Sequence, residues 1–317
     1  MSSTTATQAN PAAVCATTPT PTSSPWLLYR TIDLLQVLDG YDCGRLRDRL
    51  HVSADETTRW DQISRRLTVP FHADGIISQF DGYEQLAELE ADAYRSRYGN
   101  TGRLDLILAA EGDSPNNYRL SKQADVLMLF YLLSAEELRN IFDRLGYPLT
   151  PHTIRATVDF YTARTSHGST LSRVVHAWVN ARADRHQAWT LFAEALQADL
   201  ADTQGGTTRE GVHLGAMAGT VDLVLHCFAG LETRDDLLWL HPVLPPELSR
   251  AEFSILYKGQ QVKVELSSRL ARLRLRMCNS APIDVYVEGQ RTTMHPGDVL
   301  ETPIRPANPQ HQQTRPG

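Results

Sequence analysis

The sequence predicts a mainly α-helical protein that ends in a small antiparallel β domain. Apolar residues recur at helical spacing as far as Leu231, and Ser, Gly and Pro residues mark helix starts and stops between them. Beyond His241 the apolar residues alternate instead, over about sixty residues, as they do in short strands. Helix-loop-helix units recur without a short internal repeat, which is typical of an α/α toroid.

Local signals define the helices of the first half. A Ser followed three residues later by Glu is a capping box, Pro is favoured in the first helical turn, and Gly is favoured just after the last. These signals lie at Ser24-Pro25 before a helix over Trp26–Leu38, at Ser53 with Glu56, at Ser134 with Glu137, at Gly146 with Pro148, and at Pro151 before a helix to Ala163.

Three further helices are predicted from apolar spacing alone. One buries a face formed by Val174, Val175, Trp178 and Val179. Its partner runs from Asp184 to Leu200, and a helix rich in small residues runs from Glu210 to Leu231. Gly215 and Gly219 on the last helix are expected to allow close helix packing.

The β domain is predicted from alternation. A hairpin around Gly259 joins two apolar rows, and the strand pattern continues beyond it. The alternating residues are Ile255 and Tyr257, then Val262, Val264 and Leu266, then Leu273, Leu275 and Met277, and finally Val285 and Val287.

Composition excludes several functional classes. The 317 residues carry a net charge of −6 and no long basic run, which argues against nucleic acid as a partner. No apolar run approaches the roughly 20 residues of a membrane span. The four cysteines form no CxxC pair, so reduced thiols in a cytoplasmic protein are expected, with no metal site. Residues 1–24, rich in Ser, Thr, Ala and Pro, and residues 306–317 are expected to be a disordered leader and tail.

One segment stands out chemically. Residues Thr165–Ser172 place five hydroxyls, an imidazole and a glycine just before an amphipathic helix. Backbone N–H groups at a helix start, hydroxyl donors and a possible imidazolium at His167 favour an oxyanion such as phosphate. An ordinary Ser/Thr helix cap explains the same residues without any ligand.

Two other segments accompany it. Lys122 and Gln123 stand at the start of an apolar helix, where an exposed lysine is the simple interpretation. Amine and amide groups are also suited to sugar hydroxyls, and Asp125 is a candidate partner for Lys122 one turn away. Downstream, Glu210 and His213 lie three residues apart and are expected to share one helix face, although Glu210 is also a good capping residue.

Three motifs together resemble the C-terminal part of the family-65 disaccharide phosphorylases, which act on trehalose, maltose and kojibiose. They are Ser121–Asp125, Thr165–Ser172 and Gly205–His213, and their wording most resembles the actinobacterial branch. The resemblance covers most of the chain from Leu34 onward. It implies the C-terminal half of an (α/α)6-barrel catalytic domain over residues 25–240. A small β-sandwich that carries no chemistry would then span residues 241–305.

The resemblance also implies roles. Lys122 and Gln123 would bind the glucosyl ring, whereas Ser166, His167, Ser169 and Thr170 would hold phosphate. Glu210 and His213 would border the site. The run Gln79–Tyr83 resembles a loop that lines the barrel; an Asp-Gly turn explains it equally, and no role is assigned to it.

The implied reaction is inverting phosphorolysis of an α-glucosyl disaccharide to glucose 1-phosphate and glucose, with inorganic phosphate as co-substrate and no other cofactor. An inverting hydrolase would need a second carboxylate to activate water. Thr165–Ser172 contains none, which favours phosphorolysis; hydrolysis stays an alternative because Glu210 could lie nearby.

The family's general acid, in a Gly-Pro-Asp-Glu-Tyr motif, is not matched in this sequence, so the chain is expected to be a truncated form. Three hypotheses follow: an inactive part of a phosphorylase, one half of a split enzyme, or a non-catalytic sugar- or phosphate-binding remnant. The expected partners are the disaccharide and phosphate. A complementing N-terminal half or a second copy in a homodimer is a further expected partner.

Overall fold

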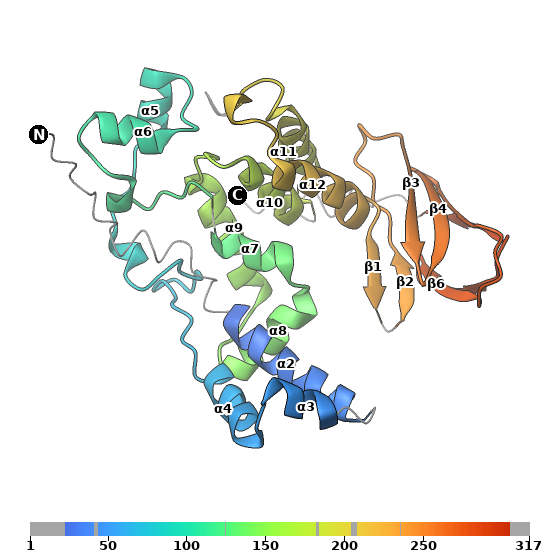
Figure 1. Ribbon diagram of the computed structural model, residues 1–317. Coiled ribbons are helices and arrows are strands. Elements are labelled where there is room, and N and C mark those ends of the chain that lie inside the picture. The colour runs from blue at the N-terminus through green and yellow to red at the C-terminus, as the bar shows by residue number, and fades with distance from the viewer. Residues whose placement is uncertain are drawn as a thin grey trace, which may run out of the picture. The chain divides into compact units, whose positions relative to one another are not determined.

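The computed structural model describes residues 23–40, 44–123, 125–181, 184–203, 208–234 and 236–304 (Figure 1). These residues form two compact units, one up to Ser166 and the other from His167 onward. The predicted leader, apart from its last two residues, and the predicted tail lie outside the described residues. None of the described helices has the length and apolarity that crossing a membrane requires.

The first unit is built from helices and two single turns of 3-10 helix. The α-helices are α2 (Ser23–Asp39), α3 (Gly44–Leu50), α4 (Ala54–Ser64), α5 (Ala91–Tyr98), α6 (Leu104–Ala110), α7 (Asp125–Leu132), α8 (Ala135–Leu145) and α9 (Pro151–Arg164), with η1 (Tyr83–Gln85) and η2 (Pro115–Asn117). Helix α7 packs against both α8 and α9, and the core of this unit includes the fully buried Leu127, Phe142 and Tyr161.

The predicted caps of this unit are confirmed at two helices, α4 and α8. Ser53 accepts a hydrogen bond from the backbone N–H of Glu56, and Ser134 and Glu137 form the reciprocal capping box. Gly146 ends α8 in the left-handed conformation, with φ of 78°. Local sequence therefore determines where these helices begin and end.

Replacing Ser134 by alanine is expected to lower the free energy of unfolding by about 1 kcal/mol, because the Glu137 N–H loses its acceptor, the Ser134 hydroxyl 3.2 Å away. Urea denaturation measures the difference. Ser134→Thr keeps the hydroxyl and serves as the control; an equal loss in both variants would show that the cap is not the cause.

The helices of the second unit are α10 (Thr170–Asn180), α11 (Arg185–Gln197), α12 (Leu214–Asp222) and the π-helix η4 (Leu223–Phe228), with a 3-10 turn η3 (Thr208–Glu210). Helices α10 and α11 form a packed hairpin, and α12 packs against both. A Cβ on Gly219 would lie only 2.7 Å from Val174 Cγ1, so the close approach predicted for this glycine is confirmed. The same prediction is wrong for Gly215, where a Cβ would meet open space.

The predicted helix Glu210–Leu231 is wrong at both ends. Gly211, with φ of 99°, separates η3 from α12, and Leu231 opens a strand. Apolar spacing does not distinguish the C-terminal boundary, because the π-helix Leu223–Phe228 and Leu231, the buried first residue of the next strand, continue the same run of apolar residues.

Two four-stranded sheets complete the second unit. One has the order β1-β2-β6-β7 and the other the order β3-β4-β5-β8. Their bounds are β1 (Leu231–Arg234), β2 (Leu237–Leu240), β3 (Arg250–Tyr257), β4 (Gln260–Ser267), β5 (Leu270–Leu275), β6 (Ile283–Val287), β7 (Gln290–Met294) and β8 (Val299–Pro303). Strands β1 and β2 precede residue 241, where the sequence predicts the start of the β domain; that division stays a prediction.

The sheets differ from the all-antiparallel expectation at one pair. Strand β2 runs parallel to β6, with Leu238 opposite Val285, because the chain crosses to the other sheet for β3–β5 before it returns. The predicted hairpin around Gly259 is confirmed, and Val262 and Val264 are fully buried. Met277 is not part of the alternation: β5 ends at Leu275, and Met277 is 76% exposed.

Candidate functional site

The candidate residues are distributed over both compact units, which divide at the Ser166–His167 peptide bond. The first unit holds Lys122, Gln123 and Ser166, and the second holds His167, Ser169, Thr170, Glu210 and His213. Each group is therefore described within its own unit.

In the first unit, the two candidate segments lie side by side. Ser121 and Thr165 form a parallel β-bridge, and the Ser166 N–H donates to the Ser121 carbonyl oxygen at 2.9 Å. The Ser166 hydroxyl donates to the same carbonyl at 3.4 Å. The backbone of Ser121, the residue before Lys122, is thus hydrogen-bonded to a segment more than forty positions later in the sequence.

Lys122 and Gln123 precede α7, and Lys122 has a different partner from the one predicted. The predicted pair of Lys122 with Asp125 is wrong: the Lys122 ammonium lies 3.9 Å from a carboxylate oxygen of Asp105. Asp125 instead accepts from the Gln123 amide at 3.3 Å. Lys122 lies outside the helix, so the one-turn spacing that brings helical side chains together does not apply. Its side chain is 55% exposed.

In the second unit, His167 adopts a left-handed backbone with φ of 56°, an uncommon conformation for a residue other than glycine. Its Nδ1 lies 3.0 Å from the Ser172 hydroxyl, and its carbonyl accepts from the Arg173 guanidinium at 3.5 Å. Burial, with the nearby Arg173 charge, lowers the pKa of His167 to about 4. The imidazolium that the sequence suggested at His167 is therefore wrong, because the ring is neutral at pH 7.

His176 is a neighbour that the sequence analysis missed. It lies on α10, is 1% exposed, and its ring centroid is 4.7 Å from that of His167 in an edge-to-face contact. Burial, and then the proximity of His167, lower the pKa of His176 to about 3. The sequence does not predict this contact, because a spacing of nine residues brings the two rings together only through the turn before α10.

Ser169 occupies the N-cap position of α10, and Thr170 is the first helical residue. The Ser169 hydroxyl makes no capping hydrogen bond within the described residues, although its carbonyl accepts from the Ser172 N–H at 3.1 Å. A helix start attracts anions through its N–H groups. The ordinary cap interpretation therefore does not account for a serine at this position.

Glu210 and His213 do not share a helix face as predicted. Glu210 ends η3, whereas His213 occupies the N-cap position of α12, and Gly211 turns the chain between them. Asp199 accepts from both the backbone N–H of His213, at 2.9 Å, and its ring Nδ1, at 2.6 Å. Hydrogen bonds from His213 lower the pKa of Asp199, so an ionised carboxylate orients this imidazole.

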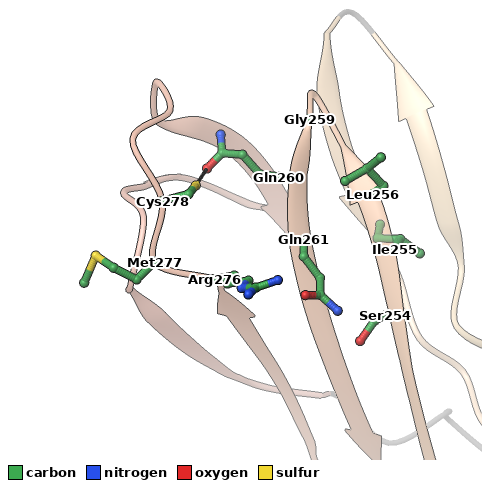
Figure 2. A pocket seen from close by; sticks show the side chains of 9 residues that line it. All are labelled: Ser254, Ile255, Leu256, Gly259, Gln260, Gln261, Arg276, Met277 and Cys278. Carbon is green, nitrogen blue, oxygen red and sulfur yellow. Dashed lines mark hydrogen bonds between the residues drawn. The ribbon is translucent and has the colours of Figure 1, made fainter.

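Among the described residues, these candidates belong neither to a cluster of metal-ligating side chains nor to the lining of a cavity in the β region. Among the described side chains, no group of three or more His, Cys, Asp and Glu could hold a metal ion. A cavity of about 600 Å³ lies at the end of the β3–β4 hairpin, where the buried Gln260 accepts from the Cys278 thiol at 3.6 Å (Figure 2). Its lining contains no candidate residue, so the hollow is not assigned to the site.

Known proteins match nearly the whole of the described chain. The central catalytic domain of glycosyl hydrolase family 65 matches residues 13–222, and the C-terminal domain of the same family matches residues 231–294. An uncharacterized glycosyl hydrolase from Mycobacterium tuberculosis is 50% identical over 276 residues, covering 87% of this chain and 21% of its own length.

A trehalose 6-phosphate phosphorylase from Lactococcus lactis is 36% identical over 204 residues, covering 64% of this chain and 26% of its own length. A solved structure of a candidate kojibiose phosphorylase from the human microbiome superposes with a TM-score of 0.67 at 19% identity. It covers 88% of this chain and 38% of the solved chain, and supports a helical-toroid and β-sandwich fold. This chain belongs to glycosyl hydrolase family 65.

Proposed function

We propose that this chain supplies glucosyl- and phosphate-binding residues to an inverting phosphorylase of α-glucosides. Lys122 and Gln123 would donate hydrogen bonds to the glucosyl ring. The segment that leads into α10 would hold phosphate, through Ser166, His167, Ser169 and Thr170. The observation that supports phosphate best is the Ser169 hydroxyl, which lies at the start of α10 and caps no backbone N–H of the described chain. The Lactococcus relative, named a phosphorylase, supports the same reaction class.

The chemistry requires an anionic nucleophile on one side of the anomeric carbon and an acid on the other. Phosphate attacks the carbon directly, so it needs positioning more than deprotonation. Thr165–Ser172 contains no carboxylate, in keeping with this requirement. These 317 residues do not match the family's acid motif, and the proposal therefore gives the chain binding roles rather than acid catalysis.

The charge at the proposed phosphate site has a physical consequence. The neutral imidazole of His167 acts as a hydrogen-bond donor or acceptor and adds no positive charge. Arg173 is only 12% exposed in its side chain and pairs with Glu194 at 2.9 Å. Phosphate recognition would therefore depend on neutral hydroxyl, imidazole and backbone N–H donors at the start of α10.

Ser169→Ala tests the phosphate assignment. Removing one neutral donor is expected to weaken binding of inorganic phosphate about 3- to 10-fold, measured by isothermal titration calorimetry. Stability should change little, because the Ser169 hydroxyl makes no capping hydrogen bond among the residues that the structure describes. Ser134→Ala is the matched control: it removes a serine hydroxyl that does cap a helix, and it should lower stability while leaving phosphate affinity unchanged. Equal phosphate affinity in wild type and Ser169→Ala would contradict the assignment.

The reaction class is tested by incubating the purified chain with trehalose, trehalose 6-phosphate, maltose or kojibiose, with and without phosphate. Formation of glucose 1-phosphate only with phosphate would support phosphorolysis by this chain with an acid of its own. Phosphate binding without turnover would support a binding role within a larger or split enzyme. Sugar release without phosphate would overturn the phosphorylase proposal in favour of hydrolysis.

A further inference from the structure

Ser121 connects the two candidate segments of the first unit. Its N–H donates to the Arg164 carbonyl at 3.0 Å, and its own carbonyl accepts from the Ser166 N–H at 2.9 Å. Lys122 follows directly in the chain. Any displacement of Ser121 would therefore move Lys122 relative to Thr165 and Ser166.

The buried hydroxyl of Ser121 is held in a defined direction. The side chain is 4% exposed and donates to the Gln79 amide oxygen at 3.1 Å. A serine hydroxyl has one hydrogen, so the Tyr83 hydroxyl, 3.4 Å away, must be the donor toward Ser121. The three side chains form one relay, from Tyr83 through Ser121 to Gln79.

Tyr83 is buried and keeps the proton that it donates toward Ser121. It is 2% exposed. Its ring meets Phe80 edge-to-face, with 5.2 Å between centroids, and lies tilted by 33° against Tyr161, with 6.0 Å between centroids. Burial raises the pKa of its phenol above the ordinary value of 10, so the hydroxyl keeps its proton at neutral pH. Gly82, with φ of 84°, turns the chain into this position.

Helix α9 holds both ends of the arrangement. The Ile77 N–H donates to the Thr157 hydroxyl at 3.2 Å, and the Ile77 carbonyl accepts from the Tyr161 hydroxyl at 3.0 Å. The last residue of the same helix, Arg164, accepts from Ser121. The Gln79–Tyr83 run and the bridge between Ser121 and Thr165 are thus attached to one rigid element.

We infer that Tyr83, Ser121 and Gln79 are positioning residues that set the distance between Lys122-Gln123 and Thr165-Ser166. The inference rests on the proposed function, in which these segments hold the glucosyl and phosphate groups. A bond-forming geometry tolerates little error, since a misplacement of about 1 Å can cost on the order of 10²-fold in rate.

Three variants of the full chain remove the relay: Tyr83→Phe, Ser121→Ala and Gln79→Leu. Each is expected to weaken binding of glucose 1-phosphate about 3- to 10-fold. Each should also increase amide hydrogen exchange at Ser121 and Ser166. Gln79→Glu keeps an acceptor for the Ser121 hydroxyl and should restore both properties to within about 2-fold of wild type.

Tyr257→Phe is the matched control. It removes the hydroxyl of another buried tyrosine, which donates to the Asp236 carbonyl at 2.6 Å in the β-sandwich. It should leave glucose 1-phosphate affinity and exchange at Ser121 and Ser166 unchanged. A general loss of stability would affect this variant and Tyr83→Phe alike.

The outcomes separate the two proposals. If the wild-type chain binds neither glucose 1-phosphate nor phosphate, the proposed function fails, and amide exchange alone decides whether the relay sets Ser166. If the wild type binds and Tyr83→Phe changes neither exchange nor affinity, the relay inference is overturned. Faster exchange with unchanged affinity would equally overturn it, because the ordering would then have no effect on the ligand.

Discussion

Gly230→Ala is expected to lower the free energy of unfolding of the second unit by about 2 to 5 kcal/mol. Gly230 has φ of 62°, and an alanine Cβ there would lie 2.1 Å from the His241 carbonyl oxygen and 2.6 Å from its carbonyl carbon. The left-handed backbone costs an L-residue about 1–2 kcal/mol, and overpacking costs about 1–3 kcal/mol more. Both neighbours are backbone atoms, so no side-chain rotation relieves the clash.

The clash would disrupt the pairing of β1 with β2. The His241 N–H donates to the Gly230 carbonyl at 3.1 Å, which extends the register that pairs Leu231 with Leu240. Urea denaturation followed by tryptophan fluorescence measures the loss. Gly289→Ala is the matched control, since Gly289 has φ of 86° and nothing within 4 Å of its added Cβ. Equal losses in the two variants would show that the close approach contributes nothing.

Acid is expected to destabilise the second unit through His167 and His176. The folded-state pKa values are about 4 and about 3, below the ordinary value of 6.5. Well above pH 6.5 both rings are neutral whether the chain is folded or unfolded, and they add no pH dependence. Below it only the unfolded chain takes up protons, so stability falls by about 1.4 kcal/mol per pH unit for each histidine. The fall continues until the folded-state pKa is reached.

His176→Leu isolates one of these contributions. It should reduce the slope of unfolding free energy against pH by about 1.4 kcal/mol per unit between pH 6 and pH 4. At pH 7 it should cost little, because neither ring nitrogen of His176 has a hydrogen-bond partner among the described residues. Asn180→Leu, also buried on α10, is the non-titrating control and should shift stability equally at every pH. An unchanged slope in His176→Leu would contradict the prediction.

Much of the fold was predictable because its signals are local. The capping box at Ser134, the left-handed Gly146 and the hairpin around Gly259 depend on residues within a few positions of each other. The errors arise where pairing between distant segments decides whether a residue joins a strand and in which direction that strand runs. Leu231 joins a strand because Leu240 pairs with it, and β2 runs parallel to β6 because the chain changes sheets between them.

The candidate site shows the same division. The motif at Lys122 and the hydroxyl-rich run before α10 were recognisable in the sequence, and so was the family. The protonation of His167 was not, because it depends on burial beside His176 and Arg173. The role now inferred for Tyr83 was also hidden, because its partner Ser121 lies 38 residues away.

The sequence by itself therefore determined the helix boundaries set by caps, the alternation of the β region and the family to which the chain belongs. These depend on short-range backbone geometry and on residue identity. Tertiary structure alone decided the strand order, the partner of Lys122, the neutral imidazoles and the Tyr83–Ser121–Gln79 relay. The physical reason is that burial and hydrogen bonding between distant segments set pKa values and side-chain directions, and neither quantity is encoded at a fixed sequence spacing.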